Sequence, residues 1–282
     1  MTSYLYPYIQ ESASLDSKLL SNYILTIQYY LDGLSFVIFD PSEQKFLCLK
    51  HYKTNEKNNT FEALMTELQE IESWSFSDFR KVNIIVDDNI NTFIPHEFSD
   101  EKMNDCYMSI MNITEKNNKS DIINSGIDNV YPISESIHEF LSNHKEINLY
   151  HSSSILIKSI FKEFSERIQE TRAFVNVKNN SYELTIVDNG NLLFHNYFNF
   201  TTKEDFIYFI LFSFEQLKID NETTPLYFMG LIEEKSVLVE LCSRYIRNIR
   251  FFKRNNDFNY TNELDSIPYY YYYILFSSVS CE

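Results

Sequence analysis

Glycine is the residue that this sequence lacks most: it has four glycines in 282 residues, whereas average usage is about 7%. A loop that wraps a phosphate closely needs glycine, because side chains keep the backbone N–H groups away from the ligand. The sequence contains neither a GxxxxGK[ST] nor a GxGxxG stretch. The two common glycine-built nucleotide sites are therefore excluded.

Positive charge is also scarce, since 24 Lys and Arg face 40 Asp and Glu for a net charge of −16. Such a surface repels nucleic acid and anionic membranes, so neither DNA nor a membrane is an expected partner. The longest apolar run, 206–214, is shorter than the roughly 20 residues of a membrane helix. The N-terminus has acidic residues and no basic start before an apolar stretch. We therefore expect an acidic cytoplasmic protein.

Metal-binding patterns are missing as well. The four cysteines are far apart and form no CxxC pair: Cys48, Cys106, Cys242 and Cys281. This spacing is typical of reduced thiols rather than of disulfides or a zinc site. His138, His144 and His151 are near one another in sequence but do not have metal-ligand spacing. No metal site is predicted.

The sequence does contain an internal repeat, because the same order of predicted strands and helices occurs in both halves. Each half begins with three strands, the first half with a turn at Asp32-Gly33 and the second at Asn189-Gly190, and both turns tolerate positive φ. Helix, strand, helix, strand and helix then follow. In the first half these elements are predicted at 23–30, 34–40, 45–51, 61–71, 82–86, 133–140, 147–151 and 153–168. In the second half they are predicted at 173–177, 182–187, 191–198, 201–217, 226–229, 234–245, 249–252 and from 266 onward. The five tyrosines at 269–273 would suit a strand equally well.

This order predicts an α/β protein with a duplicated ribonuclease H-like fold, the fold of the actin-like ATPases, with two mixed sheets flanked by helices. The first domain is expected at 1–170 with an insertion at about 89–130, and the second at 171–282. Short stretches add a closer resemblance: TFIP at 92–95, NVYPI at 129–133 and CE at 281–282. Together with the element order, they resemble the bacterial family of domain-of-unknown-function proteins numbered 3822. That family is associated with an actin-like ATPase fold and has no established activity.

The resemblance implies where a nucleotide site would lie. Actin-like ATPases place an aspartate near the end of the first strand of each half and glycines at the following turn. Here Gln28 and Asn176 occupy the aspartate positions, and Gly230 alone remains of a Gly-Gly step that would hold adenosine. Magnesium prefers anionic oxygen ligands, which amide side chains do not supply. We therefore predict a degenerate ATPase without a catalytic residue, cofactor or metal, and we interpret Gly230 first as a turn glycine.

Three functions stay open on the sequence. The leading hypothesis is a non-catalytic binding or scaffolding module, that is, a pseudoenzyme. The first alternative is a ribonuclease H-like or kinase-like enzyme that uses acids in the cleft between the halves, such as Asp87 and Asp88 at the end of the 82–86 strand.

The second alternative is a partner surface formed by five cations within eleven positions. The cluster consists of Arg244, Arg247, Arg250, Lys253 and Arg254. Such a cluster suits an acidic protein or RNA. Cations also stabilise a helix C-terminus and pair with nearby acids. This structural role is favoured over RNA binding, which the pattern leaves open.

Overall fold

The computed structural model of the chain describes residues 5–12, 15, 17–54, 60–113, 117–124, 126–164, 170–253 and 257–280. The chain forms two compact units. The first unit contains residues 1–158, 256–266 and 277–282, and the second contains 159–255 and 267–276. The last part of the chain thus contributes to both units, whereas a single division between 170 and 171 assigns all of it to the second half. None of the helices in the described residues is long and apolar enough to cross a membrane.

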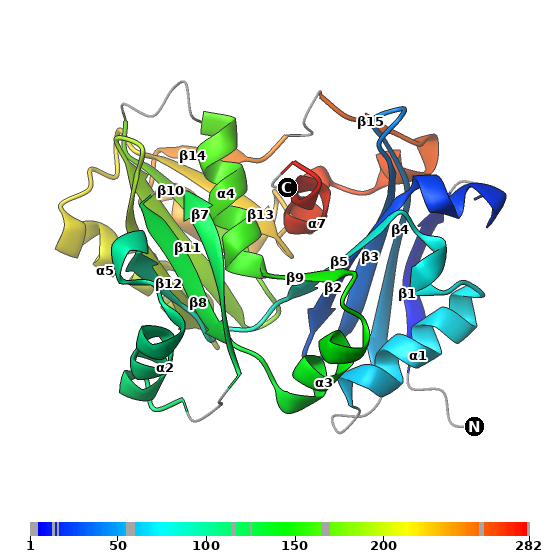
Figure 1. The fold of residues 1–282 in the computed structure, drawn as a ribbon. Coiled ribbons are helices and arrows are strands. Elements are labelled where there is room, and N and C mark those ends of the chain that lie inside the picture. Colours follow the sequence, from blue (N-terminus) through cyan, green and yellow to red (C-terminus); the bar gives the residue numbers. More distant parts are fainter. Residues whose placement is uncertain are drawn as a thin grey trace. The chain divides into compact units, whose positions relative to one another are not determined.

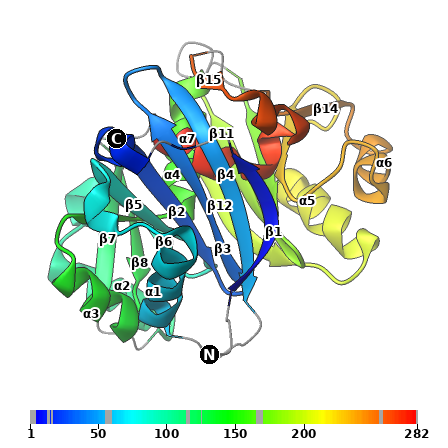
Figure 2. The same cartoon turned by 90° about the vertical axis from the view of Figure 1, so that its right-hand side faces the viewer.

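The first unit is built on a mixed sheet with the strand order β1-β4-β3-β2-β5-β9. Figure 2 shows β4, β3 and β2 side by side. The strands are β1 (Leu5–Ser12), β2 (Ile24–Tyr30), β3 (Gly33–Asp40), β4 (Lys45–Thr54), β5 (Lys81–Val86) and β9 (Ile147–His151). The first four pair antiparallel, β5 pairs in parallel with β2, and β9 pairs in parallel with β5. The predicted meander and crossover strands are therefore confirmed, and β1 is an addition that the sequence pattern did not indicate.

Helices α1 (Phe61–Glu72) and α3 (Glu135–Asn143) pack against each other and against the same core of this sheet. Thr60 caps α1, because its side chain accepts a hydrogen bond from the Ala63 N–H. Phe61 then meets Tyr29 of β2 edge-on, with ring centroids 5.0 Å apart. Helix α4 (Ser152–Phe164) begins directly after β9. Short 3₁₀ helices lie at Ser17–Asn22 and Phe76–Asp78.

The stretch predicted as an insertion forms a third, small sheet with the order β6-β8-β7. Its elements are β6 (Thr92–Pro95), a 3₁₀ turn (His96–Phe98), α2 (Glu101–Ile110), β7 (Asn118–Asn124) and β8 (Ile127–Pro132). Ile94, Met108 and Val130 form its own apolar core. The sequence predicted two sheets, and the described residues form three because this segment is long enough to pair with itself.

The second unit repeats the plan of the first with the strand order β12-β11-β10-β13-β14 (Figure 1). The strands are β10 (Arg172–Val177), β11 (Ser181–Asp188), β12 (Asn191–Asn199), β13 (Pro225–Gly230) and β14 (Asn248–Phe251). Helices α5 (Lys203–Leu217) and α6 (Val237–Ser243) contribute to its core. The capping box of Thr202 and Asp205 begins α5, and Ser236 caps α6 later than the predicted residue 234.

Backbone register shows that the two sheets correspond strand by strand. The Asp87 N–H donates to the Tyr29 carbonyl at 2.9 Å, and the Leu231 N–H donates to the Val177 carbonyl at 2.7 Å. The residue after β5 thus bonds to β2 in the first unit, as the residue after β13 bonds to β10 in the second, so β2 and β10 hold equivalent places. The duplicated ribonuclease H-like architecture is therefore confirmed.

The tyrosine run is helical, as one of the two predictions stated. It forms a 3₁₀ turn (Tyr269–Tyr272) that continues as α7 (Tyr273–Ser278), after β15 (Asn259–Tyr260) and a 3₁₀ helix at Asn262–Ser266. In the second unit the Tyr273 ring lies 4.2 Å from that of Phe252, and the Tyr270 ring lies 4.9 Å from that of Phe251. Aromatic packing on the end of β14 thus decides between helix and strand.

Candidate functional site

Polar side chains gather where β5 and β9 of the first unit end. Asp87 follows β5, and its two carboxylate oxygens accept hydrogen bonds from Gln28 Nε2 and Ser152 Oγ, each at 2.8 Å. Gln28 is 5% exposed and Ser152 is fully buried. The ends of parallel strands meet at one edge of a sheet, which is why residues so far apart in sequence touch. The Gln28 amide and the Asp87 carboxylate thus bond to each other at the position where the resemblance implies a magnesium-binding acid.

His151, the last residue of β9, is fully buried and connects three parts of this edge. Its Nδ1 accepts a hydrogen bond from the Ser153 N–H at 3.1 Å, and its Nε2 lies 3.2 Å from Asp88 Oδ1. A backbone N–H can only donate, so Nδ1 carries no proton and Nε2–H donates to Asp88. The two contacts therefore assign one neutral tautomer, and the ring serves as the cap of α4.

The small third sheet is joined to the same edge by Asp121 of β7. Its carboxylate accepts hydrogen bonds from the His151 N–H at 2.9 Å and from the Tyr131 hydroxyl at 3.0 Å. Burial raises the pKa of Asp121, although these hydrogen bonds lower it. Asn129 of β8 donates to Ser154 Oγ of α4 at 2.9 Å. The insertion is thus held to β9 and α4 by buried polar contacts.

From Gln28, a row of polar side chains also runs across the sheet through β3 and β4. Gln28 stands opposite Ser35 of β3, and Ser35 stands opposite His51 of β4. The Tyr30 hydroxyl donates to Ser35 Oγ at 3.0 Å, and Ser35 Oγ lies 2.7 Å from His51 Nδ1. Burial lowers the pKa of His51 to about 4, while nearby Asp32 raises it and Lys53 lowers it. His51 is therefore neutral at pH 7, and its Nδ1 can accept a hydrogen bond from the Ser35 hydroxyl.

Because His51 is neutral in the folded protein, we predict that the free energy of unfolding falls in mild acid. Folded His51 stays neutral down to about pH 4, whereas the unfolded chain takes up its proton near 6.5. Its contribution is therefore complete above pH 6.5 and is lost as the pH falls toward 4, amounting to at most about 3 kcal/mol. We expect His51→Gln to flatten the fall of the free energy of unfolding between those pH values, measured by urea denaturation. Parallel curves for the two proteins would contradict this role.

The second unit carries its own buried pair at the equivalent place. Asn176 Nδ2 donates to Glu183 Oε2 at 2.6 Å, and Lys178 Nζ lies 3.9 Å from Glu183 Oε1. Glu183 is fully buried. Asn176 stands opposite Glu183 in β11 as Gln28 stands opposite Ser35 in β3. Both amides at the predicted phosphate-loop positions thus lie against side chains of their own unit.

Gly230 ends β13 with φ at 83°. A Cβ atom added there would lie 2.1 Å from the Val177 carbonyl oxygen and 2.7 Å from Asn176 Oδ1. The glycine is therefore required by the turn and by the close approach of β10.

The acids and histidines considered as enzyme residues have different bonding partners and do not form one cluster. Asp87 bonds to Gln28 and Ser152, whereas Asp88 bonds to His151. His138 lies on α3, and His144 follows α3 and pairs with Glu146 at 3.5 Å. No three His, Cys, Asp or Glu side chains in the described ranges are grouped so that they could hold a metal. The residues present do not fit the magnesium and phosphate arrangement that the resemblance implies.

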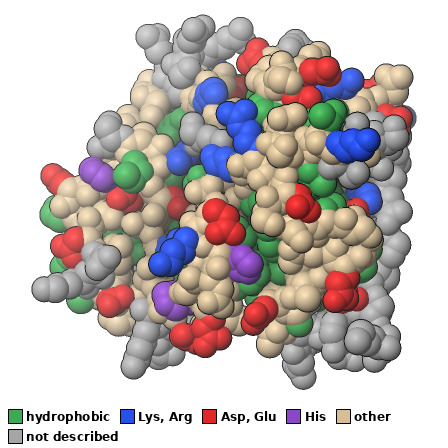
Figure 3. All heavy atoms as spheres, turned by 45° about the vertical axis from the view of Figure 1, so that its right-hand side comes forward, with side chains coloured by type: hydrophobic (Ala, Val, Ile, Leu, Met, Phe, Trp, Pro, Cys, Tyr) green, Lys and Arg blue, Asp and Glu red, His purple; other side chains and the backbone are tan. Residues whose placement is uncertain are grey.

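The basic cluster has partners within the fold. Arg244 lies 2.7 Å from Glu240 on an exposed helix face, and Arg247 lies 3.4 Å from Glu222. Arg250 donates to the Tyr227 hydroxyl at 3.0 Å and stacks over its ring. Lys253 is exposed, and Arg254 lies outside the described residues. Figure 3 shows, on one face, Lys and Arg side chains that lie among acidic and neutral ones.

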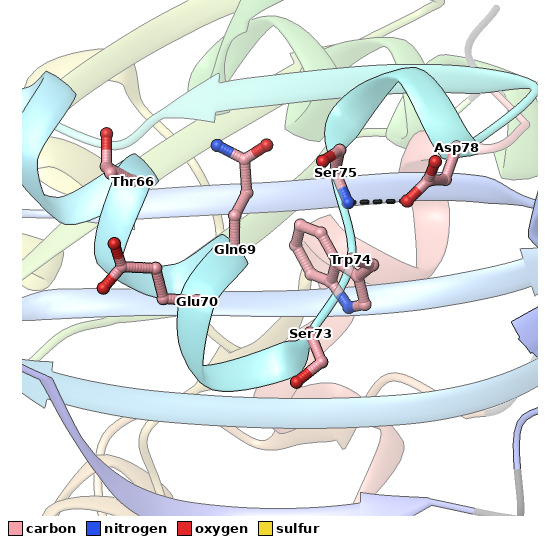
Figure 4. Close-up of a pocket in the computed structure, with 7 residues that line it drawn as sticks. All are labelled: Thr66, Gln69, Glu70, Ser73, Trp74, Ser75 and Asp78. Atoms are coloured by element: carbon pink, nitrogen blue, oxygen red, sulfur yellow. Dashed lines mark hydrogen bonds between the residues drawn. The ribbon is translucent and has the colours of Figure 1, made fainter.

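A shallow surface hollow lies elsewhere in the first unit, beside the end of α1 (Figure 4). Its lining is Thr66, Gln69, Glu70, Ser73, Trp74, Ser75 and Asp78. The Ser75 N–H donates to Asp78 at 2.7 Å, the dashed line in the figure. The Trp74 ring packs edge-on against Phe36 and Phe79 in the core. None of the predicted site residues lines this hollow.

A family model described as "Protein of unknown function (DUF3822)" matches residues 12–249. The chain belongs to the DUF3822 family. No protein of curated function matches the sequence.

Solved structures place the DUF3822 chain among actin-like ATPase folds. A Bacteroides thetaiotaomicron protein "with actin-like ATPase fold and unknown function" is similar at a TM-score of 0.70 and 22% identity, over 87% of this chain and 97% of that one. The "PilM-PilN type IV pilus biogenesis complex" contains a chain similar at a TM-score of 0.57 and 11% identity, over 92% of this chain and 98% of that one. At these identities the likeness establishes the fold.

Sequence reasoning missed several residues of this site. Asp121 and Glu183 look like ordinary acids in strands, and the spacing of His151 from the other histidines indicates an ordinary surface or core histidine. One local signal was present, because His151-Ser152-Ser153-Ser154 follows a short apolar strand at a sheet edge. Such a polar run at the start of a helix indicates a cap and a polar site.

Proposed function

We propose that this DUF3822 protein is a cytoplasmic, non-catalytic binding or scaffolding protein built on a degenerate actin-like ATPase fold. The observation that carries the proposal is the contact of Gln28 with Asp87, whose carboxylate also accepts from Ser152. A nucleotide-bound magnesium ion at this edge would need these oxygens, and it would have to displace hydrogen bonds that are already made.

The second unit supports the same proposal. Asn176 and Glu183 form a buried pair, and the backbone of β10 lies against Gly230. A phosphate needs several free backbone N–H groups in a concave turn. The loop of residues 178–181 has no glycine, and its Lys178 N–H already donates to the Ser181 carbonyl at 2.8 Å. A binding role through another surface is consistent with the PilM-PilN structure, in which a protein of this fold is in a complex with another protein.

Calorimetric titration of the purified protein with Mg-ATP tests the proposal. We expect no saturable heat, because neither unit offers an acid and a phosphate-binding turn together. A matched titration of Asp87→Asn distinguishes weak surface binding from a metal site. A magnesium-dependent isotherm for the wild type that disappears in Asp87→Asn would overturn the proposal.

The alternative of a ribonuclease H-like or kinase-like enzyme receives less support. Such chemistry needs carboxylates that share a metal, and Asp87 and Asp88 bond to different partners. Binding of RNA through the basic cluster predicts an affinity that falls steeply with salt and that is lost in Arg247→Glu with Arg250→Glu. The pairing of Arg247 with Glu222 supports the structural role instead.

A further inference from the structure

Arg172 begins β10 of the second unit, and its side chain is buried although it carries a permanent positive charge. The residue is 8% exposed, whereas arginine is almost never fully buried unless it is paired. Among the described residues, no group accepts a hydrogen bond from Arg172 Nε or Nη1, and both nitrogens are buried. A buried guanidinium without acceptors has lost its hydration and gained no hydrogen bonds in return. The packing of the second unit does not explain this side chain.

The contacts that Arg172 does make compensate little of its charge. Its Nη2 lies 3.6 Å from Glu170 Oε2, which is too long for a hydrogen bond, and the Glu170 side chain is 73% exposed. Exposed ion pairs of this kind contribute little to stability. The guanidinium also lies over the Phe164 ring, 4.9 Å from the ring centroid. Such stacking uses the face of the guanidinium and leaves the N–H groups at its edges available to an acceptor.

The internal repeat shows that the fold does not need a cation at this position. The Val177 carbonyl corresponds to that of Tyr29, because each accepts from the residue after the neighbouring parallel strand. Counting back five residues along each strand aligns Arg172 with Ile24, which is buried. Each of the two stands opposite a buried apolar residue of the next strand. A buried charge that the architecture does not require, and that lowers stability, is typical of a functional position.

A ligand can approach the guanidinium from the side of Nη2. The Arg172 side chain keeps 10% of its surface exposed, and Nη2 lies beside the largely exposed Glu170. In the planar guanidinium, Nη2 shares one edge with Nε and the other edge with Nη1. An oxyanion at Nη2 can therefore accept a second hydrogen bond from either of the two unpartnered nitrogens. The small exposed fraction suits a small anion and not an extended anionic surface.

We propose that Arg172 binds a small oxyanion, a carboxylate or a phosphate, through an edge of its guanidinium. The anion supplies the negative charge and the acceptors that the described residues do not supply. Stacking on Phe164 orients the guanidinium before the anion binds. Arg172 is at the start of β10, whereas Asn176 is near the end of this strand. The proposal is therefore independent of whether the degenerate nucleotide positions bind a nucleotide.

Urea denaturation at matched ionic strength tests the proposal with sodium chloride, sodium acetate and sodium phosphate as probes. A ligand that binds only the folded protein raises the midpoint of denaturation. We expect acetate or phosphate to raise the wild-type midpoint above that in chloride, with saturation, and the comparison of the two identifies the source of the oxyanion. Arg172→Ile introduces the residue of the first unit and should weaken the apparent binding at least about tenfold. In chloride, this variant should resist urea at least as well as the wild type, because it removes a buried charge without a partner.

Arg244→Gln is the matched control, because it removes an arginine of the same unit whose side chain is 64% exposed. It should respond to each anion like the wild type. General stabilisation by salt would appear equally in Arg172→Ile, so the difference between the two variants measures the site. An equal response of the wild type and Arg172→Ile overturns the proposal.

A second measurement does not depend on unfolding. In protein with ¹⁵N-labelled arginine, the Nε–H signal of Arg172 is identified by its absence from the spectrum of Arg172→Ile. We expect this signal to shift during titration with acetate or phosphate and to exchange more slowly with water. Glu170→Gln removes the competing carboxylate and should bind the anion at least as tightly as the wild type. A signal that responds to neither anion, or binding that is lost in Glu170→Gln, overturns the proposal.

Discussion

Replacing Gly230 with alanine is expected to lower the free energy of unfolding by about 3 kcal/mol or more. The alanine Cβ would lie 2.1 Å from the Val177 carbonyl oxygen and 2.8 Å from the Val177 nitrogen. Both are backbone atoms of the central strand β10, which cannot move without breaking its pairing with β11 and β13. The residue also has φ at 83°, which side-chain-bearing residues rarely adopt. Urea denaturation followed by circular dichroism measures the loss.

Gly126→Ala is the matched control for this substitution. The nearest atom to a Cβ at Gly126 is the Asn124 side-chain oxygen at 3.6 Å, an ordinary contact distance. We expect a change within about 0.5 kcal/mol, as for most surface substitutions. If Gly230→Ala proves as mild as Gly126→Ala, the close approach of β10 to this turn is not a constraint on the fold.

Asn176→Leu is expected to destabilise the protein by about 2–3 kcal/mol. Leucine has the same branched arrangement of four side-chain heavy atoms, but it removes the donor that bonds to Glu183 at 2.6 Å. Glu183 is fully buried, so its carboxylate would lose a hydrogen bond that water cannot replace. The midpoint of urea denaturation should therefore fall clearly below that of the wild type.

A double-mutant cycle separates this pair from general packing damage. Glu183→Leu alone removes the buried charge, and Asn176→Leu added to it should then cost much less than in the wild type. The expected interaction free energy is about 1–3 kcal/mol. Strict additivity of the two substitutions would show that the hydrogen bond contributes nothing to stability.

Much of the fold follows from local patterns along the chain. Apolar alternation between turns such as Asp32-Gly33 predicts the meanders, and threonines directly before the apolar helical patterns cap α1 and α5. The strand β1 escaped prediction because Pro7 interrupts its pattern, and the structure has a bulge between Pro7 and Ile9. Proline is tolerated there since β1 is an edge strand.

The candidate site could be predicted only in part. The order of strands predicts that Gln28 lies at the site, but it does not identify the partner Asp87, which is 59 residues away. Ser152 is a further 65 residues from Asp87. Which side chains meet at the end of a sheet depends on register and on the start of α4, and neither is visible in composition or periodicity. The sequence likewise does not indicate that His51 is buried, and it is this burial that lowers the pKa of its imidazole.

The return of the chain to its first unit has a consequence for synthesis on the ribosome. Strand β15 pairs with β4, where the Tyr260 ring stacks on Phe46 at 5.3 Å. Further along, Ser278 Oγ lies 3.4 Å from Thr26 Oγ1 of β2. Domains often fold in the order of synthesis, yet the first unit lacks these contacts until nearly the whole chain has emerged. During synthesis, β4 therefore lacks its pairing with β15 until the second unit has been made. A shortened chain that ends before residue 257 would lack segments of both units.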